Sequence, residues 1–252
     1  MLVVISPAKK LDENCDLDVI SKFTVPPYLE SSKKIIKALR GYSADNLSKL
    51  MNTSEKISEL NYNRNIKWSL PFNKSNSLQA LLMFKGDVYK GISVKDFNKD
   101  DFLFAQKSLR ILSGLYGILK PLDLIQPYRL EMGTQLQIGK HRNLYDFWGD
   151  EITNILNSDK NNDYLINLAS VEYFKSINVD NLKSKLINVS FKEKRDGKYK
   201  IIAIYSKRAR GLMSRYIIKN KIIDPKSLKK FNLEDYKFNK TLSSDSDLVF
   251  TR

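Results

Sequence analysis

The sequence predicts a mixed α/β (α+β) domain in which a mixed sheet is flanked by helices. Three observations indicate this class: an apolar run at 2–5, helical spacing across 28–68, and a hairpin signal at Asp196-Gly197. The 252 residues contain no internal repeat, low-complexity linker or break in composition. We therefore expect a single domain that covers 1–252.

The first predicted element is a strand formed by the apolar run LVVI at 2–5. A short run that is apolar throughout is typical of a central strand whose two faces are both covered. The run ends at Ser6-Pro7, and Lys9 and Lys10 follow. Because it is so short and lacks a basic segment before it, it does not resemble a signal peptide.

Helices dominate the prediction for 28–68, where apolar residues recur at helical spacing. Ser43 is a suitable N-cap for one short helix, and Thr53 or Ser54 for the next. The two helices and the tight turn over 43–68 could form a helix-hairpin-helix element, because basic residues lie nearby: Lys49, Lys56, Arg64 and Lys67. The alternative is a helical pair whose polar face is only solvated, which is the commoner outcome of such a pattern.

Shorter elements are predicted in the middle of the chain. Residues 76–86 fit either a helix or a strand, and 100–119 fit a helix that breaks near Gly114 and Gly117. The periodicity further along predicts a helix at 150–158, a strand at 163–170 and a short helix at 171–177.

The last part of the chain predicts a hairpin followed by a basic helix. Asp196-Gly197 joins two strand-like segments within 184–206, and Asp-Gly is a strong signal for a two-residue turn. The second segment includes the β-branched and aromatic run Ile201–Tyr205, and a helical pattern follows it. A weak helix and a last strand complete the tail.

The overall charge is strongly positive. The chain has 43 Lys and Arg against 28 Asp and Glu, a formal charge of +15 at pH 7. A balance of this size favours a polyanionic partner, either a nucleic acid or an anionic membrane surface. The membrane is the weaker alternative, because no basic amphipathic helix with exposed aromatic residues is evident. No stretch approaches ~18 apolar residues, so no membrane span is expected.

Cysteine and histidine are almost absent. The chain contains only Cys15 and His141, so a disulfide within it is impossible and no zinc site of the usual kind is expected. This usage fits the reducing cytosol. The sequence also lacks a GxGxxG run and the Lys-Ser/Thr pair of a P-loop, so we expect no cofactor.

The segment 113–134, SGLYGILKPLDLIQPYRLEMGT, is unusually rich in glycine and proline. This density specifies a particular backbone path, and long ordered loops often carry binding residues. Its polar candidates are Tyr128, Arg129 and Glu131. The alternative is an elaborate turn packed by its leucines. A second loop, FKGDVYKG at 84–91, places Lys85 and Asp87 around a glycine; it could approach a phosphate or form an ordinary surface pair.

Most of the excess positive charge lies in one part of the chain. Residues 198–240 hold thirteen basic and three acidic residues. If the basic helix begins near Arg208, its free N–H groups and nearby cations would form an anion site suited to phosphate. The alternative is a solvated basic helix. The candidate phosphate-binding residues of this helix are Lys207, Arg208, Arg210 and Arg215.

Several of these segments together resemble the bacterial peroxide stress protein YaaA family. The matching stretches run in family order and cover essentially the whole chain: ISPAKKL (5–11), FKGDVYKG (84–91), LRILSGLYGILKPLDLIQPYRLEMGT (109–134), LYDFWGD (144–150), INLASVEYFKSI (166–177) and KRARGLMSRYII (207–218). One departure is Lys10, where the family pattern has threonine.

The resemblance implies a cytoplasmic protein that limits oxidative damage by peroxide and is associated with lower available intracellular iron. It also implies DNA binding, an unusual α/β fold, a positively charged cleft and a helix-hairpin-helix element. A ferritin-like iron store needs a Glu/His constellation in a helix bundle, which this sequence lacks. Any effect on iron is therefore expected to be indirect.

Two functions follow as hypotheses. In the first, the protein binds DNA largely independently of sequence, and phosphates are held by Lys207, Arg208, Arg210 and Arg215, with Lys9, Lys85 and Arg129 lining the same cleft. In the second, it is an enzyme that acts on a nucleotide or nucleic-acid base, and the basic cluster anchors phosphate. Asp87, Tyr128 and Glu131 would then lie beside the chemistry, with a carboxylate as acid or base. The sequence does not specify the oligomeric state.

Overall fold

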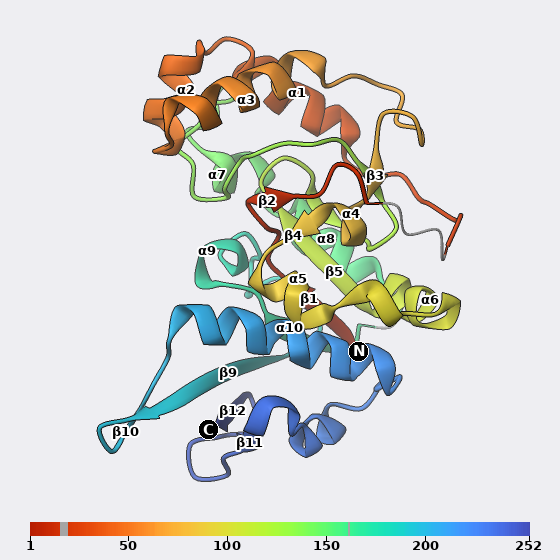
Figure 1. The fold of residues 1–252 in the computed structure, drawn as a ribbon, viewed down its shortest axis with the longest axis vertical. Coiled ribbons are helices and arrows are strands. Elements are labelled where there is room, and N and C mark those ends of the chain that lie inside the picture. The colour runs from red at the N-terminus through yellow and green to blue at the C-terminus, as the bar shows by residue number, and fades with distance from the viewer. Residues whose placement is uncertain (16–19, 161) are drawn as a thin grey trace.

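A mixed sheet runs through the computed structural model, which describes residues 1–15, 20–160 and 162–252 (Figure 1). Within these residues its strand order is β11-β12-β9-β8-β1-β5-β6, and β10 pairs with β9 outside this path. The predicted mixed α/β class is confirmed. The strands of this sheet are β1 (Leu2–Ile5), β5 (Leu109–Ser113), β6 (Gly117–Leu119), β8 (Tyr164–Leu168), β9 (Lys185–Arg195), β10 (Lys198–Lys200), β11 (Lys237–Phe238) and β12 (Asp247–Thr251).

The centre of the sheet is parallel. Strands β5, β1, β8, β9 and β12 run parallel to one another, whereas β6, β10 and β11 pair antiparallel with β5, β9 and β12. All four residues of β1 are buried, and Ile5 pairs with Ile111 on one side and with Leu168 on the other. The predicted central strand at 2–5 is therefore confirmed. The order of the strands along the chain reverses at β1.

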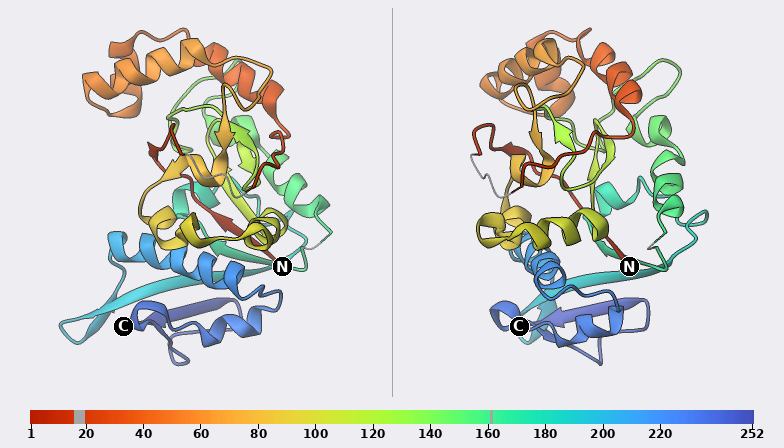
Figure 2. Two further views of the ribbon diagram at one scale, coloured as in Figure 1. Left: turned by 45° about the vertical axis from the view of Figure 1, so that its right-hand side comes forward. Right: turned by 90° about the vertical axis from the view of Figure 1, so that its right-hand side faces the viewer.

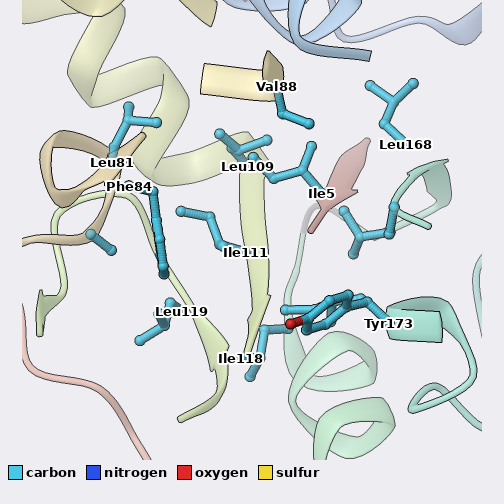
Figure 3. Packing of buried hydrophobic residues seen from close by; sticks show 14 of the residues in the cluster. Ile5, Leu81, Phe84, Val88, Leu109, Ile111, Ile118, Leu119, Leu168 and Tyr173 are labelled. Atoms are coloured by element: carbon cyan, nitrogen blue, oxygen red, sulfur yellow. The ribbon is translucent and has the colours of Figure 1, made fainter. Parts of the chain in front are cut away.

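Helices cover both faces of the sheet (Figure 2). One face carries α5 (Asp87–Ile92), α6 (Lys99–Ser108) and α10 (Ala203–Lys219), and the other carries α7 (Leu144–Trp148), α8 (Glu151–Ser158) and α9 (Val171–Phe174). Figure 3 shows part of the buried cluster between these layers, including Ile5, Val88 and Leu109. The helices predicted at 150–158 and 171–177 and the strand predicted at 163–170 are confirmed.

Three further helices, α1 (Leu29–Leu39), α2 (Ala44–Met51) and α3 (Glu55–Lys67), form one end of the molecule, at the top of Figure 1. Ser43 caps α2 as predicted, because its hydroxyl accepts a hydrogen bond from the Asn46 N–H at 3.2 Å. A turn with Asn52 in the left-handed conformation leads from α2 to Ser54, the N-cap position of α3. The helical pair is present, and its role as a DNA-binding helix-hairpin-helix stays a prediction.

Short elements connect the sheet to these helices. Strand β2 (Lys10–Leu11) pairs antiparallel with β4 (Phe84–Lys85), which ties the segment after β1 to the loop before α5. Strand β3 (Leu78–Gln79) pairs with β7 (Leu124–Ile125), and α4 (Ala80–Met83) lies between β3 and β4. Residues 76–86 therefore contain both a helix and strands. The remaining elements are the 3-10 helices η1 (Val94–Asp96), η2 (Pro225–Lys230) and η3 (Leu233–Asp235).

The prediction for 100–119 is wrong in its second half. Helix α6 ends at Ser108, and the next residues form strand β5 instead of continuing the helix to Gly114. Every residue of β5 is buried, and the strand pairs with β1 on one side and β6 on the other. Tertiary pairing therefore overrides a local pattern of leucines that also fits a helix.

The prediction for Ile201–Tyr205 is also wrong. The hairpin itself is confirmed, since Asp196 and Gly197 have φ values of 50° and 74° and join β9 to β10. However, β10 ends at Lys200 and α10 begins at Ala203. Because Arg208 lies well inside α10, the expected convergence of free helix N–H groups at Arg208 does not occur. Among the described residues, no helix is long and apolar enough to cross a membrane.

Candidate functional site

A pocket of about 500 Å³ lies at the carboxyl ends of β1 and β8, and we call it the strand-edge pocket. In open α/β sheets, ligands bind outside the carboxyl ends of parallel strands, at the point where the strand order reverses. Here that point is β1. The pocket is lined by 6–10, 85–89, 128–131, Ser170, Glu172, Tyr173, Lys207 and Arg210.

Two serines join the strand ends at the base of this site. The Ser170 N–H donates to the Ser6 hydroxyl at 2.9 Å, and the two hydroxyl groups lie 3.3 Å apart. The Tyr89 hydroxyl donates to the Ser6 carbonyl at 3.1 Å, which attaches α5 to the same point. These bonds fix β1, β8 and α5 relative to one another around the pocket.

Helix α10 reaches the pocket because its backbone packs directly against α5. A β-carbon on Gly211 would overlap the Val88 carbonyl oxygen, and one on Gly91 would overlap the Arg208 carbonyl oxygen. Only glycine permits this approach at the crossing. The close packing brings Lys207 and Arg210 of α10 beside the 85–89 loop, so both line the pocket.

Four exposed lysines line the pocket, and we call them the rim lysines: Lys9, Lys10, Lys85 and Lys207. The side chain of Lys9 is 60% exposed and lies 2.6 Å from Glu131. That of Lys85 is 58% exposed and lies 2.5 Å from Asp12. Exposed ion pairs of this kind contribute little stability and are screened by salt. The rim lysines can therefore exchange these partners for an external anion.

Two arginines lie deeper, and we call them the inner arginines: Arg129, whose side chain is only 16% exposed, and Arg210. The Nε atom of each is buried and has no hydrogen-bond partner. Arg129 lies 3.5 Å from Glu131. Burial lowers the pKa of the Arg210 guanidinium. Among the described residues, no carboxylate lies within ion-pair distance of Arg210. A partly buried guanidinium without a close carboxylate partner is costly, so this arrangement is suited to an anion.

The other two predicted arginines do not line the pocket. Arg208 pairs with Glu234 at 2.5 Å, and this hydrogen-bonded pair raises the pKa of Arg208. Arg215 makes a two-pronged ion pair with Asp96 and also donates to the Ser93 carbonyl at 2.8 Å. Both guanidinium groups therefore have protein partners, with which a phosphate would compete. Their phosphate-binding role stays a prediction.

The three candidate catalytic residues, Asp87, Tyr128 and Glu131, all line the strand-edge pocket. The Tyr128 hydroxyl lies 2.6 Å from that of Ser113 at the end of β5, and burial raises the Tyr128 pKa above its usual value. Asp87 pairs with Lys90 at 3.5 Å and not with Lys85. The pocket thus combines the predicted acids with five of the seven predicted phosphate-binding residues: Lys9, Lys85, Arg129, Lys207 and Arg210.

Sequence reasoning missed several lining residues: Ser6, Lys10, Tyr89, Ser170, Glu172 and Tyr173. Glu172 accepts a hydrogen bond from the Gly133 N–H at 3.0 Å, which ties the 113–134 segment to α9. Ser6 follows the predicted strand at 2–5 and Ser170 ends the predicted strand at 163–170, so the strand-end rule could have identified them. His141 lies outside the pocket, 3.7 Å from Asp146. Within the described part of the chain, no group of three or more His, Cys, Asp or Glu side chains is placed to hold a metal ion.

Comparisons with known proteins agree on one family. The family model described as "Peroxide stress protein YaaA" matches residues 1–242. A UPF0246 protein of Acaryochloris marina is 51% identical over 253 residues, covering 100% of each chain. UPF0246 proteins of Neisseria meningitidis and Saccharophagus degradans are 49% and 50% identical over 255 residues, covering 100% of this chain and 98% and 99% of theirs.

Proposed function

The chain belongs to the peroxide stress protein YaaA family, and from this premise we propose that it binds DNA during the cytoplasmic response to peroxide. Bound protein would limit oxidative damage to the DNA it covers. The association with lower available iron is then indirect, because the proposed action needs no iron site in the protein.

The charge of the strand-edge pocket is the observation that supports this proposal most strongly. Among the described residues, six basic side chains line it against three carboxylates. The rim lysines are exposed on segments far apart in the sequence, so they could contact phosphates on a backbone that passes over the pocket. Contacts to phosphates carry no sequence information, so we expect binding to be largely independent of sequence.

The helical pair α2–α3 would supply a second backbone contact. Lys49 and Lys56 are exposed on these helices. Arg64 is less available, because it pairs with Glu13 at 2.5 Å and its side chain is mostly buried.

The test measures the binding of two unrelated duplexes to the triple variant K9Q/K85Q/K207Q by fluorescence anisotropy. We expect weaker binding to both duplexes, and a plot of log affinity against log salt whose slope is smaller by about three. The matched control K226Q/K229Q/K230Q removes the same charge from η2, outside the pocket. If both triple variants lose the same affinity, only net charge matters and the proposed site is wrong.

A second candidate function is an enzyme that acts on a nucleotide or a nucleic-acid base. The observation that favours it is that Asp87, Tyr128 and Glu131 line the same pocket as the basic residues. One of the carboxylates would act as the general acid or base. Its test is product formation from a nucleoside, nucleotide or base that is abolished by Glu131→Gln while binding is retained. Unchanged turnover in this variant would exclude Glu131 from that role.

A further inference from the structure

The rim and the interior of the strand-edge pocket suit ligands of different size. A DNA duplex covers on the order of 1,000 Å² or more of protein surface, so it can lie across the exposed rim. The strand-edge pocket holds about 500 Å³, which is the range of small-molecule sites. The interior therefore suits a ligand much smaller than a duplex.

The inner arginines indicate that this smaller ligand carries an anionic group. Among the described residues Arg210 has no carboxylate partner and Arg129 has only a long contact with Glu131, at 3.5 Å, whereas Arg208 and Arg215 pair closely with Glu234 and Asp96. A guanidinium presents its donors in a planar fork that matches two phosphate oxygens. Lys207 lies three residues before Arg210 on α10, which places both on one face of that helix. These groups form a candidate phosphate subsite.

The rest of the lining suits more than a phosphate. Tyr89, Tyr128 and Tyr173 are buried side chains of the pocket wall, with apolar contributions from Val88 and Leu130. Three carboxylates, Asp87, Glu131 and Glu172, also line it. Inorganic phosphate needs neither an apolar wall nor hydrogen-bond acceptors. A nucleotide would use the phosphate subsite, the apolar wall and the carboxylates. Its base stacks on apolar surface and donates hydrogen bonds from its ring or exocyclic nitrogens.

We propose that the strand-edge pocket takes up a single nucleotide unit, with its phosphate on Arg129 and Arg210 and its base against the tyrosine and carboxylate lining. This inference rests on the proposed function, because the nucleotide would come from the bound DNA as an unpaired nucleotide. A free nucleoside monophosphate presents the same chemistry and is the other possible source.

The binding experiment uses the full chain and isothermal titration calorimetry with deoxynucleoside monophosphates. We expect at least one of them to bind, and the matching nucleoside and inorganic phosphate to bind at least tenfold more weakly. Arg210→Gln should weaken nucleotide binding at least tenfold, and Arg129→Gln provides an independent variant if the first does not fold. Lys226→Gln, in η2 outside the pocket, is the control and should bind like the unchanged protein. No binding of any monophosphate overturns the proposal, even if duplex binding is intact.

The source is tested with 2-aminopurine placed opposite an abasic position in a duplex. Uptake from DNA predicts a change in its fluorescence on addition of the protein, and loss of that change in Arg210→Gln although the duplex is still bound. An unchanged signal at saturating protein overturns DNA as the source. Binding of monophosphates without any binding of DNA would contradict the proposed function and leave the pocket assigned to a free nucleotide.

Discussion

Gly211 of α10 lies so close to Val88 of α5 that a β-carbon on the glycine would overlap the valine carbonyl oxygen. This crossing places residues that are far apart in the sequence on one pocket: Asp87 at the start of α5, and Lys207 and Arg210 on α10. The site therefore depends on a backbone contact in which the side chains of the basic helix take no part.

We predict that Gly211→Ala destabilises the protein and disrupts the pocket. The added methyl group forces α10 away from α5, and overpacking of this kind costs about 1–3 kcal/mol or more. Urea unfolding measures the loss of stability, and DNA anisotropy measures the loss of affinity. Gly41→Ala is the control, because the nearest atom to a β-carbon there lies 3.2 Å away. Equal stability of the two variants would contradict the close packing.

Arg215 should contribute to stability more than Arg208. Arg215 holds both oxygens of Asp96 and also the carbonyl oxygens of Ile92 and Ser93. Arg215→Gln leaves these acceptors without a charged donor, which we expect to cost about 1–3 kcal/mol. Arg208→Gln breaks a more exposed pair with Glu234 and should cost less than about 1 kcal/mol. Chemical denaturation compares them, and the reverse order would show that the Asp96 pair is not formed in solution.

The helical pair α2–α3 is predicted to contact DNA phosphates. Replacing the exposed Lys49 and Lys56 by glutamine should reduce the salt dependence of duplex binding by about two in slope, since each lost phosphate contact removes about one. The double variant K33Q/K34Q on the exposed face of α1 removes the same charge as a control. If K49Q/K56Q keeps the slope of the unchanged protein, these helices do not bind DNA.

Asp101 should make stability sensitive to acid. Its burial alone would raise its pKa, but hydrogen bonds from Lys221 and Lys219 outweigh this, and the pKa is lowered to about 2. A carboxyl group whose pKa is lower in the folded protein than in the unfolded chain stabilises the fold above pH ~4. That contribution is lost as the pH falls from about 4 to about 2.

The variant Asp101→Asn tests this linkage. It removes the ion pairs to Lys219 and Lys221 and weakens the capping box of α6 with Asn98. We expect a loss of about 1–3 kcal/mol at pH 6 that shrinks toward pH 3. Unfolding in urea at both pH values measures it, with Asp100→Asn, an exposed neighbour, as the control. A loss independent of pH would contradict the role of the charge.

The sequence predicted correctly those elements that are specified by a few neighbouring residues. The buried strand at 2–5, the Ser43 cap and the Asp-Gly hairpin all depend on a few neighbouring residues. The strand at 109–113 was not predicted, because its leucines fit a helix equally well. Its strand conformation depends on pairing with β1 and β6, which are distant or later elements. The start of α10 was not predicted, because the N-cap position is held by Ile202, whose side chain cannot cap a helix.

The sequence predicted the basic chemistry of the candidate site but not which residues line it. Basic residues and the 84–91 and 113–134 loops were identified from composition and spacing, and many of them meet at the strand-edge pocket. Which arginines of α10 enter it depends on where the helix begins and how Gly211 packs on α5. Neither property can be read from a run of charges. The partners of Arg208 and Arg215, Glu234 and Asp96, lie 26 and 119 residues away in the sequence.

The salt dependence of duplex DNA binding tests the central claim most directly. If the four rim lysines together with Lys49 and Lys56 of the helical pair engage about six phosphates, affinity should fall by about three decades between 50 and 200 mM salt. The logarithm of the affinity should fall linearly with the logarithm of the salt concentration, with a similar slope for unrelated DNA sequences. An affinity that stays constant over this range would contradict the claim that this protein holds DNA by its phosphates.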